Sequence, residues 1–181
     1  MTKIYTKKGD DGKTYILGGK CVKKSCIEIV ATGEVDELNA MIGLLCAELS
    51  GVEDLAEKLK KIQHKLFVVG SNIAAVQTDL VEVPKLEPEH VEQLEHWIDE
   101  MNEELDELKQ FILPGGNKAA SISFIARAVC RRAERHLIKL TDHYEVDLML
   151  RRYLNRLSDF LFVLGRYINK KHDVEDIAWK K

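Results

Sequence analysis

The sequence predicts an all-α protein: a five-helix up-and-down bundle preceded by an irregular N-terminal arm. From residue 35 onward the apolar residues recur at steps of three and four, which is the period of an amphipathic helix. Prolines and glycines interrupt this period at Pro84, at Pro88 and at Pro114-Gly115-Gly116, where helices are expected to end. The 181 residues, 45% of them hydrophobic, suit one domain with one core. Short connections between helices predict an up-and-down order.

The elements follow in order along the chain. The first 31 residues carry four glycines and seven lysines with little helical periodicity, so we expect an ordered arm or a short hairpin there. Five helices are then expected from the apolar series Val35 to Leu49, Leu55 to Ile73, Val91 to Leu108, Ile122 to Leu140 and Leu150 to Ile168. We expect one domain over residues 1–181, divided into an N-terminal arm (1–31), a helical bundle (32–172) and a C-terminal tail (173–181).

Charge and composition exclude several classes of protein. The net charge of −3 argues against binding of nucleic acid by bulk electrostatics. No apolar stretch approaches the ~20 residues that cross a bilayer, so no membrane association is expected. Charged residues from Lys3 to Asp11 leave no room for a secretory signal, which predicts a cytoplasmic protein. The four cysteines form no CxxC pair and are expected to be reduced.

Arginine is confined to one part of the chain. All eight arginines lie between Arg127 and Arg166, and every earlier Lys or Arg position is a lysine. A guanidinium group can hold phosphate or carboxylate oxygens through paired donors, so this confinement suggests an anion-recognition surface. Helical spacing places Arg127, Arg131 and Glu134 on one face of the fourth helix. It places Arg152, Asn155, Asp159 and Arg166 on one face of the fifth. A solvated face with ion pairs is the alternative interpretation.

The segment from Thr6 to Thr14 combines glycines, lysines and hydroxyl groups. Glycines allow close backbone approach, and lysines and hydroxyls can bind phosphate oxygens, so the segment could hold a triphosphate. It is not a P-loop, because the first glycine of that motif would stand at position 7, which is a lysine. An ordinary charged turn is the alternative.

The segment from Phe111 to Gly116 is an apolar triplet that ends in a rigid turn. Most such turns only connect helices. A phenylalanine beside two glycines would also suit a flat hydrophobic ligand lying over the turn.

Five stretches of the chain together resemble the successive signatures of the PduO-type ATP:cob(I)alamin adenosyltransferases, or corrinoid adenosyltransferases. They are KIYTKKGDDGKT, GEVDELNAMIG, FILPGGNKAAS, ARAVCRRAER and RYLNRLSDFLFVLGRYIN, in family order over residues 3–169. The resemblance implies a cobalamin adenosyltransferase-like (ferritin-like) bundle that forms a homotrimer with active sites between subunits. It implies an enzyme, a transferase of an alkyl group other than methyl, that transfers the 5′-deoxyadenosyl group of ATP to the cobalt of cob(I)alamin. Triphosphate would leave and adenosylcobalamin would form. Magnesium would accompany ATP, and a reductase and an adenosylcobalamin-dependent acceptor enzyme are further partners that it implies.

The resemblance also assigns roles to individual residues. The residues that match the ATP site are Thr6, Lys7, Gly9, Asp10, Lys13, Thr14, Lys24, Arg131, Glu134, Arg135 and Asn155, with Glu134 near the magnesium ion. The residues that match the corrinoid site are Phe111, Leu113 and Pro114, and Phe111 would crowd the lower face of cobalt. Asp36 and Arg127 match a pair that bridges subunits, and with Arg131 and Phe111 they form the expected catalytic set. The chain departs from the family pattern at Ser25-Cys26-Ile27-Glu28, where Asp-x-Arg or Asp-Pro is common, and at Thr32, where an aromatic residue is usual.

Two other functions compete with this one. A non-catalytic helical nucleotide-binding or interaction module would explain five amphipathic helices, but neither the Gly/Lys arm nor the segregated arginines. A ferritin-like di-iron bundle would need two inward Glu-x-x-His pairs, and the sequence has only Glu87 to His90.

Overall fold

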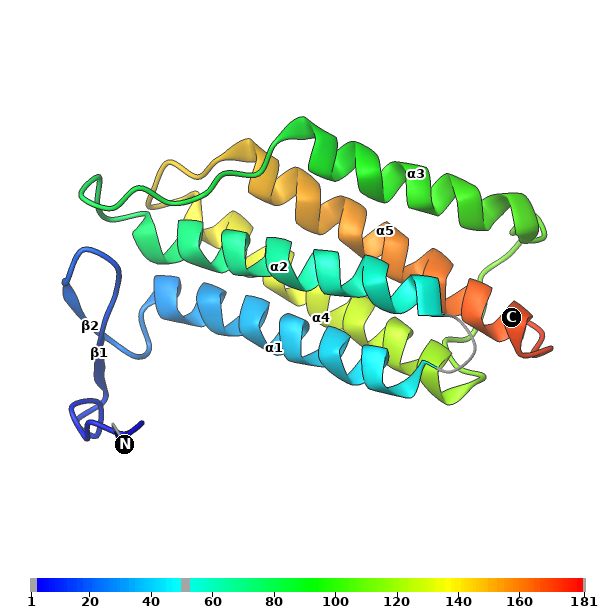
Figure 1. The fold of residues 1–181 in the computed structure, drawn as a ribbon, viewed down its shortest axis with the longest axis horizontal. Helices are drawn as coiled ribbons and strands as arrows, with labels where there is room; N and C mark the ends of the chain where they lie inside the picture. The colour runs from blue at the N-terminus through cyan, green and yellow to red at the C-terminus, as the bar shows by residue number, and fades with distance from the viewer. Residues whose placement is uncertain (1–2, 50–52, 181) are drawn as a thin grey trace.

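The computed structural model describes residues 3–49 and 53–180, which form five long helices and one small hairpin. The helices are α1 (Ile27–Glu48), α2 (Glu53–Ala75), α3 (Pro88–Glu104), α4 (Lys118–Leu140) and α5 (Leu148–Lys171). Strands β1 (Lys13–Tyr15) and β2 (Cys21–Lys23) pair antiparallel, with Lys13 opposite Lys23. Successive helices run in opposite directions along one axis (Figure 1), which confirms the predicted up-and-down bundle.

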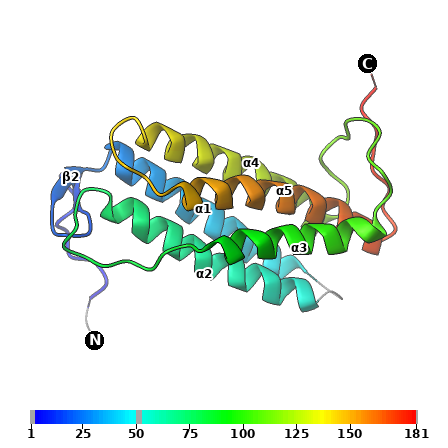
Figure 2. The same cartoon turned by 90° about the horizontal axis from the view of Figure 1, so that it is seen from above.

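The apolar series of the sequence form the core. Helix α4 packs against α1 and α5, α2 packs against α1, and α3 packs against α5 (Figure 2). The largest fully buried side chains come mainly from the predicted faces and include Leu38, Ile42, Leu59, Ile73, Leu137 and Phe160. Removing this apolar surface from water is the main force that holds the helices together. No helix among residues 3–49 and 53–180 has the length and hydropathy needed to span a bilayer.

Two helix boundaries differ from the prediction. Helix α1 begins at Ile27 rather than near Val35. Ala31 is fully buried four residues before Val35, so the buried face extends one more turn toward the N-terminus. Helix α3 ends at Glu104, so Leu105 and Leu108 of the predicted series lie outside it. There the chain leaves the bundle to pair with the C-terminal tail.

The arm contains the short hairpin that the sequence allowed. Gly18 and Gly19 form its turn with φ angles of 85° and 81°, which glycine adopts without strain. The turn packs on the segment after α2, since a Cβ atom on Gly18 would lie 2.7 Å from Thr78 Oγ1. Ile16 is buried, whereas most other arm side chains are exposed. The arm therefore has few attachments to the bundle, and it lies at the end where α1 begins (Figure 1).

The opposite end of the bundle holds a second small backbone pairing. The Leu113 amide donates to the Ile177 carbonyl at 2.8 Å, and the Trp179 amide donates to the Phe111 carbonyl at 2.8 Å. Ile112 and Ala178 form the bridge between them. Figure 2 shows this segment before α4 running beside the C-terminal tail. The tail thus forms part of the structure around the Pro-Gly-Gly turn.

Candidate functional site

A buried asparagine fastens the Pro114-Gly115-Gly116 turn to α5. The side chain of Asn169, which is 3% exposed, accepts a hydrogen bond from the backbone N–H of Asn117 at 2.9 Å and donates one to the backbone carbonyl of Gly115 at 2.9 Å. Gly116 has φ 104°, and a Cβ atom there would lie 2.4 Å from Asn169 Oδ1, so only glycine fits. Asn117 then caps α4, because its side chain accepts from the Ala119 amide at 2.8 Å. The turn therefore places the start of α4 and the residues before it.

Phe111 is 79% exposed, and it stacks edge-on against Trp179 of the tail with ring centroids 6.5 Å apart. Leu113 and Pro114 are also exposed beside it. A buried guanidinium group holds the two segments together: Arg166 donates to Asp176 Oδ2 at 2.6 Å and to the Asp106 carbonyl at 2.8 Å. The three predicted corrinoid residues are thus exposed in one short apolar segment, and Trp179 places an indole ring beside Phe111.

Helix α4 carries an open basic face. Arg131 and Arg135 are exposed, and no hydrogen bond or ion pair of the described residues engages either guanidinium group. Between them Glu134 accepts a hydrogen bond from Asn155 of α5 at 3.1 Å. The structure therefore brings these four predicted ATP residues together across α4 and α5.

Other arginines have structural roles. Arg132 joins α4 to α1 through Glu34, at 2.5 Å, and Glu37. Arg156 joins α5 to Glu95 of α3 at 2.9 Å. Arg166 was expected on the same face as Asn155, but it is buried and forms an ion pair with Asp176 of the C-terminal tail. The ion-pair interpretation therefore applies to Arg132, Arg156 and Arg166, and anion recognition stays a prediction for the arginines that remain open.

The remaining predicted ATP residues lie on the arm. Lys7 has φ 61° and starts a tight bend in which the Thr6 hydroxyl accepts from the Lys8 amide at 3.4 Å. The Lys24 amide donates to the Gly12 carbonyl at 2.9 Å, and the Lys24 ammonium would lie 3.1 Å from a Cβ atom on Gly9. Asp10 and Lys13 are exposed nearby, and Thr14 is half-buried on β1. Among the described residues no ion pair occupies the lysines of the arm, so they are available to an anion.

Within one chain these groups do not all meet. The arm lies at the end where α1 begins, and the Phe111 segment lies at the other end of the bundle (Figures 1 and 2). A helix as long as α4 spans about 35 Å at 1.5 Å per residue, and Arg131 lies about 20 Å along it from Lys118. In the described part of the chain no hydrogen bond or ion pair joins the arm to α4. Asp36 is exposed and makes no ion pair with Arg127, whose guanidinium lies 5.5 Å from the Phe162 ring centre.

Two hollows border these surfaces. A cavity of about 640 Å³ lies where the segment after α3 meets the C-terminal tail. Its lining includes Leu105, Ile112, Arg166, Lys170 and Asp176. A smaller hollow of about 320 Å³ between α3 and α5 is lined in part by Asn155 and Arg152. The apolar surface of Phe111 is open rather than enclosed, so a flat ligand could reach it without rearrangement of the helices.

The residues that the structure describes contain no cluster of metal ligands, and one of the four thiols, Cys130, is buried. Among residues 3–49 and 53–180 no three His, Cys, Asp or Glu side chains gather around one point. Glu134 is a single carboxylate, which suits a magnesium ion held mainly by phosphate oxygens. Burial raises the pKa of the Cys130 thiol well above its usual range, and the thiol donates to the Leu154 carbonyl.

Comparison with known proteins decides the family. The family model described as cobalamin adenosyltransferase matches residues 4–168. The chain belongs to the cobalamin adenosyltransferase family. A corrinoid adenosyltransferase of Bacillus subtilis (strain 168) is 44% identical over 182 residues, which cover 99% of this chain and 93% of that protein. A cobalamin adenosyltransferase of Cupriavidus metallidurans is 42% identical and covers all of this chain and 96% of its own.

A solved structure agrees with this membership in the cobalamin adenosyltransferase family. It is a variant of the PduO-type ATP:corrinoid adenosyltransferase from Lactobacillus reuteri in which histidine replaces a phenylalanine, complexed with cobalamin and ATP. It superposes with a TM-score of 0.95 at 33% identity, over 99% of this chain and 97% of that one. The family resemblance and the fold predicted from the sequence are therefore confirmed.

Sequence reasoning missed two residues that shape the candidate site, Asn169 and Trp179, and it placed a third, Arg166, on a solvent-facing surface although Arg166 is buried. Asn169 directly follows the last apolar residue of the fifth series, Ile168, and resembles an ordinary polar residue of a helix end. Trp179 lies 68 positions after Phe111 and in a segment without periodicity. A tryptophan in a polar C-terminal tail was the one available signal, because a large aromatic side chain seldom lacks a packing partner.

Proposed function

We propose that this member of the cobalamin adenosyltransferase family transfers the 5′-deoxyadenosyl group of ATP to the cobalt of cob(I)alamin and releases triphosphate. The observation that carries the proposal is the open face of α4, where Arg131 and Arg135 flank the Glu134–Asn155 hydrogen bond. Two exposed guanidinium groups beside an ordered carboxylate form a suitable surface for a magnesium-bound polyphosphate.

The reaction needs little covalent chemistry from the protein. Cobalt in the +1 state supplies the electron pair that forms the bond to C5′ of ATP, and the C5′–oxygen bond breaks with its electrons leaving on triphosphate. Negative charge therefore grows on the leaving group in the transition state. Arg131, with Lys7, Lys13 and Lys24 of an arm, stabilises that charge more strongly than it stabilises bound ATP. Loss of one such donor is expected to lower the rate by about 10²- to 10³-fold.

The remaining arm residues, Thr6, Gly9, Asp10 and Thr14, hold the nucleotide in place. Glu134 would hold the magnesium ion, and the Asn155 side chain positions Glu134 by donating a hydrogen bond to its Oε1. Magnesium, when bound, neutralises part of the phosphate charge. The protein's task is to position both substrates and to exclude water between them.

The Phe111 surface has a different task from the arginines. Phe111, Leu113 and Pro114 offer an apolar floor for the corrinoid, and Phe111 excludes a ligand from the lower face of cobalt. A cobalt ion without that ligand is easier to reduce from the +2 to the +1 state. Phe111, Leu113 and Pro114 therefore act in the reduction of cobalt from the +2 to the +1 state, for which a reductase partner supplies the electron. The triphosphate site acts in the transfer of the adenosyl group.

The proposal includes assembly into a homotrimer with active sites between subunits. The arm and the Phe111 segment lie at opposite ends of one helical bundle (Figure 1). An arm that extends away from its own bundle is therefore well placed to reach the Phe111 segment of a neighbouring subunit. Asp36 and Arg127 form the pair between subunits. We further propose a cytoplasmic enzyme that delivers its product to an adenosylcobalamin-dependent acceptor, which four unpaired cysteines support.

The direct test mixes the protein with ATP, magnesium and chemically reduced cobalamin and follows the visible spectrum. Formation of an alkylcobalt product with release of triphosphate is the expected result. A non-catalytic nucleotide-binding module would instead show a rise in melting temperature with ATP and no spectral change. ATP at 100 times its dissociation constant adds about 2.7 kcal/mol to the free energy of unfolding, so binding alone is measurable.

A further inference from the structure

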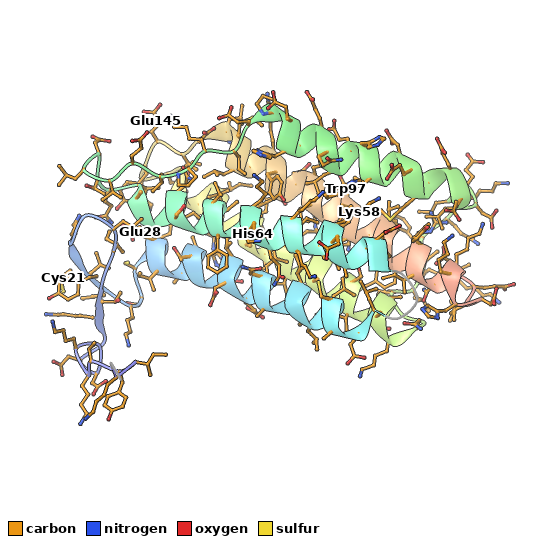
Figure 3. All side chains as sticks on the ribbon, viewed as in Figure 1. Cys21, Glu28, Lys58, His64, Trp97 and Glu145 are labelled. Carbon is orange, nitrogen blue, oxygen red and sulfur yellow. The ribbon has the colours of Figure 1, made fainter. Side chains whose placement is uncertain are left out.

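A buried carboxylate lies where the arm meets the bundle. Glu28, in the first turn of α1, is 3% exposed, and its Oε1 atom accepts a hydrogen bond from the Tyr144 hydroxyl at 2.5 Å. Tyr144 belongs to the loop between α4 and α5, 116 residues away. Figure 3 shows Glu28 at this junction, with Cys21 on the arm and Glu145, the neighbour of Tyr144, in the loop.

The environment of Glu28 keeps its carboxylate charged. Burial alone would raise the pKa of Glu28, but hydrogen bonds from Tyr144 and Cys26 and the charge of Lys20 outweigh this effect and lower the pKa below its ordinary value. The same bond raises the pKa of Tyr144 to about 12, so the hydroxyl stays protonated and donates. A buried carboxylate needs such partners, because an unpaired one would be costly to keep from water.

The groups around Glu28 come from three parts of the chain. Cys26 is the N-cap residue of α1 and gives the helix no side-chain cap. Lys20 follows the turn of the arm hairpin, and Tyr144 comes from the far loop. Glu28 is therefore hydrogen-bonded to the loop after α4, whereas Lys20 of the arm hairpin acts on it through charge alone. Glu28 also lies in the stretch where this chain departs from the family pattern.

The start of α1 leads directly into the lysine-containing part of the arm. The chain passes from Lys24 to α1 through Ser25 and Cys26. The Lys24 backbone N–H donates to the Gly12 carbonyl, and the Lys24 side chain lies beside Gly9. Apart from Ile16 and the contact of Gly18 with Thr78, the arm has little else to set its direction. A small rotation at the start of α1 would therefore displace the lysines of the arm.

We propose that Glu28 is a positioning residue for the nucleotide: with Tyr144 it sets the direction in which the arm leaves the bundle, and so the place at which Lys24 meets the triphosphate of ATP. This inference rests on the proposed function, since it assumes that the arm binds ATP. Glu28 acts through geometry, because its own negative charge would repel a polyphosphate.

The test measures ATP affinity with magnesium by titration calorimetry, and KM for ATP and for cobalamin, in the full chain. Tyr144→Phe removes one hydroxyl and is expected to weaken ATP binding about tenfold or more, the range for loss of a hydrogen bond to a charged group. KM for cobalamin should stay within about twofold, whereas kcat should fall as well, because a displaced Lys24 no longer stabilises the charge on the leaving triphosphate. Glu28→Ala should match Tyr144→Phe, and the double variant should be no worse than either alone.

Two further variants separate positioning from charge and from general stability. Glu28→Gln keeps an oxygen that accepts from Tyr144, so it should retain most of the ATP affinity that Glu28→Ala loses. Tyr167→Phe is the matched control, because it removes a tyrosine hydroxyl that donates to Glu104 at 3.1 Å at the other end of the bundle. It should leave ATP affinity unchanged.

Tighter ATP binding in Glu28→Gln and Glu28→Ala would overturn the inference, since it would mean that the charge and not the geometry matters. The inference is also wrong if Tyr144→Phe binds ATP as tightly as the wild type and only its melting temperature falls, as in Tyr167→Phe. The Tyr144–Glu28 hydrogen bond would then contribute to stability alone. A wild-type protein that binds ATP but forms no alkylcobalt product would refute the proposed function. The ATP affinities of the Glu28 and Tyr144 variants would still test whether Glu28 positions the arm.

Discussion

Asn169 fastens the Pro-Gly-Gly turn to α5, and its replacement by alanine tests how far that turn controls corrinoid binding. The amide of Asn169 makes two hydrogen bonds of 2.9 Å with backbone groups on either side of Gly116. Asn169→Ala keeps the helix and removes only the amide. The Gly115 carbonyl and the Asn117 amide then lose their partner, and Phe111 loses the fixed turn that follows it.

The magnitude follows from the bonds that are lost. Two neutral hydrogen bonds contribute about 0.5–1.5 kcal/mol each, so Asn169→Ala should lower the free energy of unfolding by about 1–3 kcal/mol. For a chain of this size, 1 kcal/mol corresponds to a shift of about 2–4 °C in melting temperature. We expect a loss of about 4–8 °C if the change is about 2 kcal/mol.

The assay compares urea unfolding at fixed protomer concentration with KM for cobalamin and for ATP. KM for cobalamin should rise in Asn169→Ala, while KM for ATP should not change, because Asn169 touches no arm residue. Asn72→Ala is the matched control, since the Asn72 side chain also makes two hydrogen bonds to the backbone, donating to the carbonyls of Val68 at 2.8 Å and Pro84 at 2.7 Å, but far from the turn. It should lose stability and keep KM for cobalamin.

A coupling experiment tests the geometry directly. Gly116→Ala places a Cβ atom 2.4 Å from Asn169 Oδ1, so the clash should be relieved in the Asn169→Ala background while the strain of φ 104° remains. Strictly additive losses would refute this reasoning, as would equal rises of both KM values in Asn169→Ala.

The remaining predictions concern the triphosphate site, assembly, the arm and pH. Arg131→Ala should lower turnover even with cobalamin supplied in the +1 state, and Arg131→Lys should recover only part of it. Phe111→Ala should lose far more activity from the +2 state than from the +1 state, and equal losses for both variants in both assays would contradict the division of roles. Asp36→Asn should shift light scattering from a trimer toward the 20.7 kDa chain, whereas a wild-type mass near one chain would contradict the trimer. Proteolysis within residues 7–24 should slow when magnesium-ATP is added, and equal cleavage rates would count against an ATP-binding arm. The pKa of Glu28 is lowered on folding, so its contribution to stability is present above about pH 4.3 and should be lost as the pH falls through the folded pKa, a loss that Glu28→Gln should abolish in acid titration.

The bundle could be predicted from the sequence because its information is local. Steps of three and four between apolar residues place a stripe on one face of a helix, and residues such as Leu38, Leu59, Leu137 and Leu157 are fully buried as predicted. Proline and glycine marked the ends of helices for the same local reason. The arm hairpin was an open alternative, since its short strands have no apolar alternation.

The ends of elements depended on packing. The first turn of α1 forms because Ala31 is buried against the bundle, although the segment contains Gly33 and β-branched residues that are poor helix formers. Leu105 continued the period of α3, yet the chain leaves the helix there and pairs with the tail. Spacing along one segment contains no information about what packs against it.

The sequence by itself determined five amphipathic helices, their order, and the residue types that suit a triphosphate and an apolar ring. Only the tertiary structure decided which of these residues meet. It separated Arg131 and Arg135, which stay open, from Arg132 and Arg166, which serve as internal ion pairs. It also brought Trp179 to Phe111 and Tyr144 to Glu28, contacts between residues 68 and 116 positions apart. The physical reason is that a helix period reports which face is buried, whereas a hydrogen bond or ring contact depends on the relative placement of segments that the core packing alone fixes.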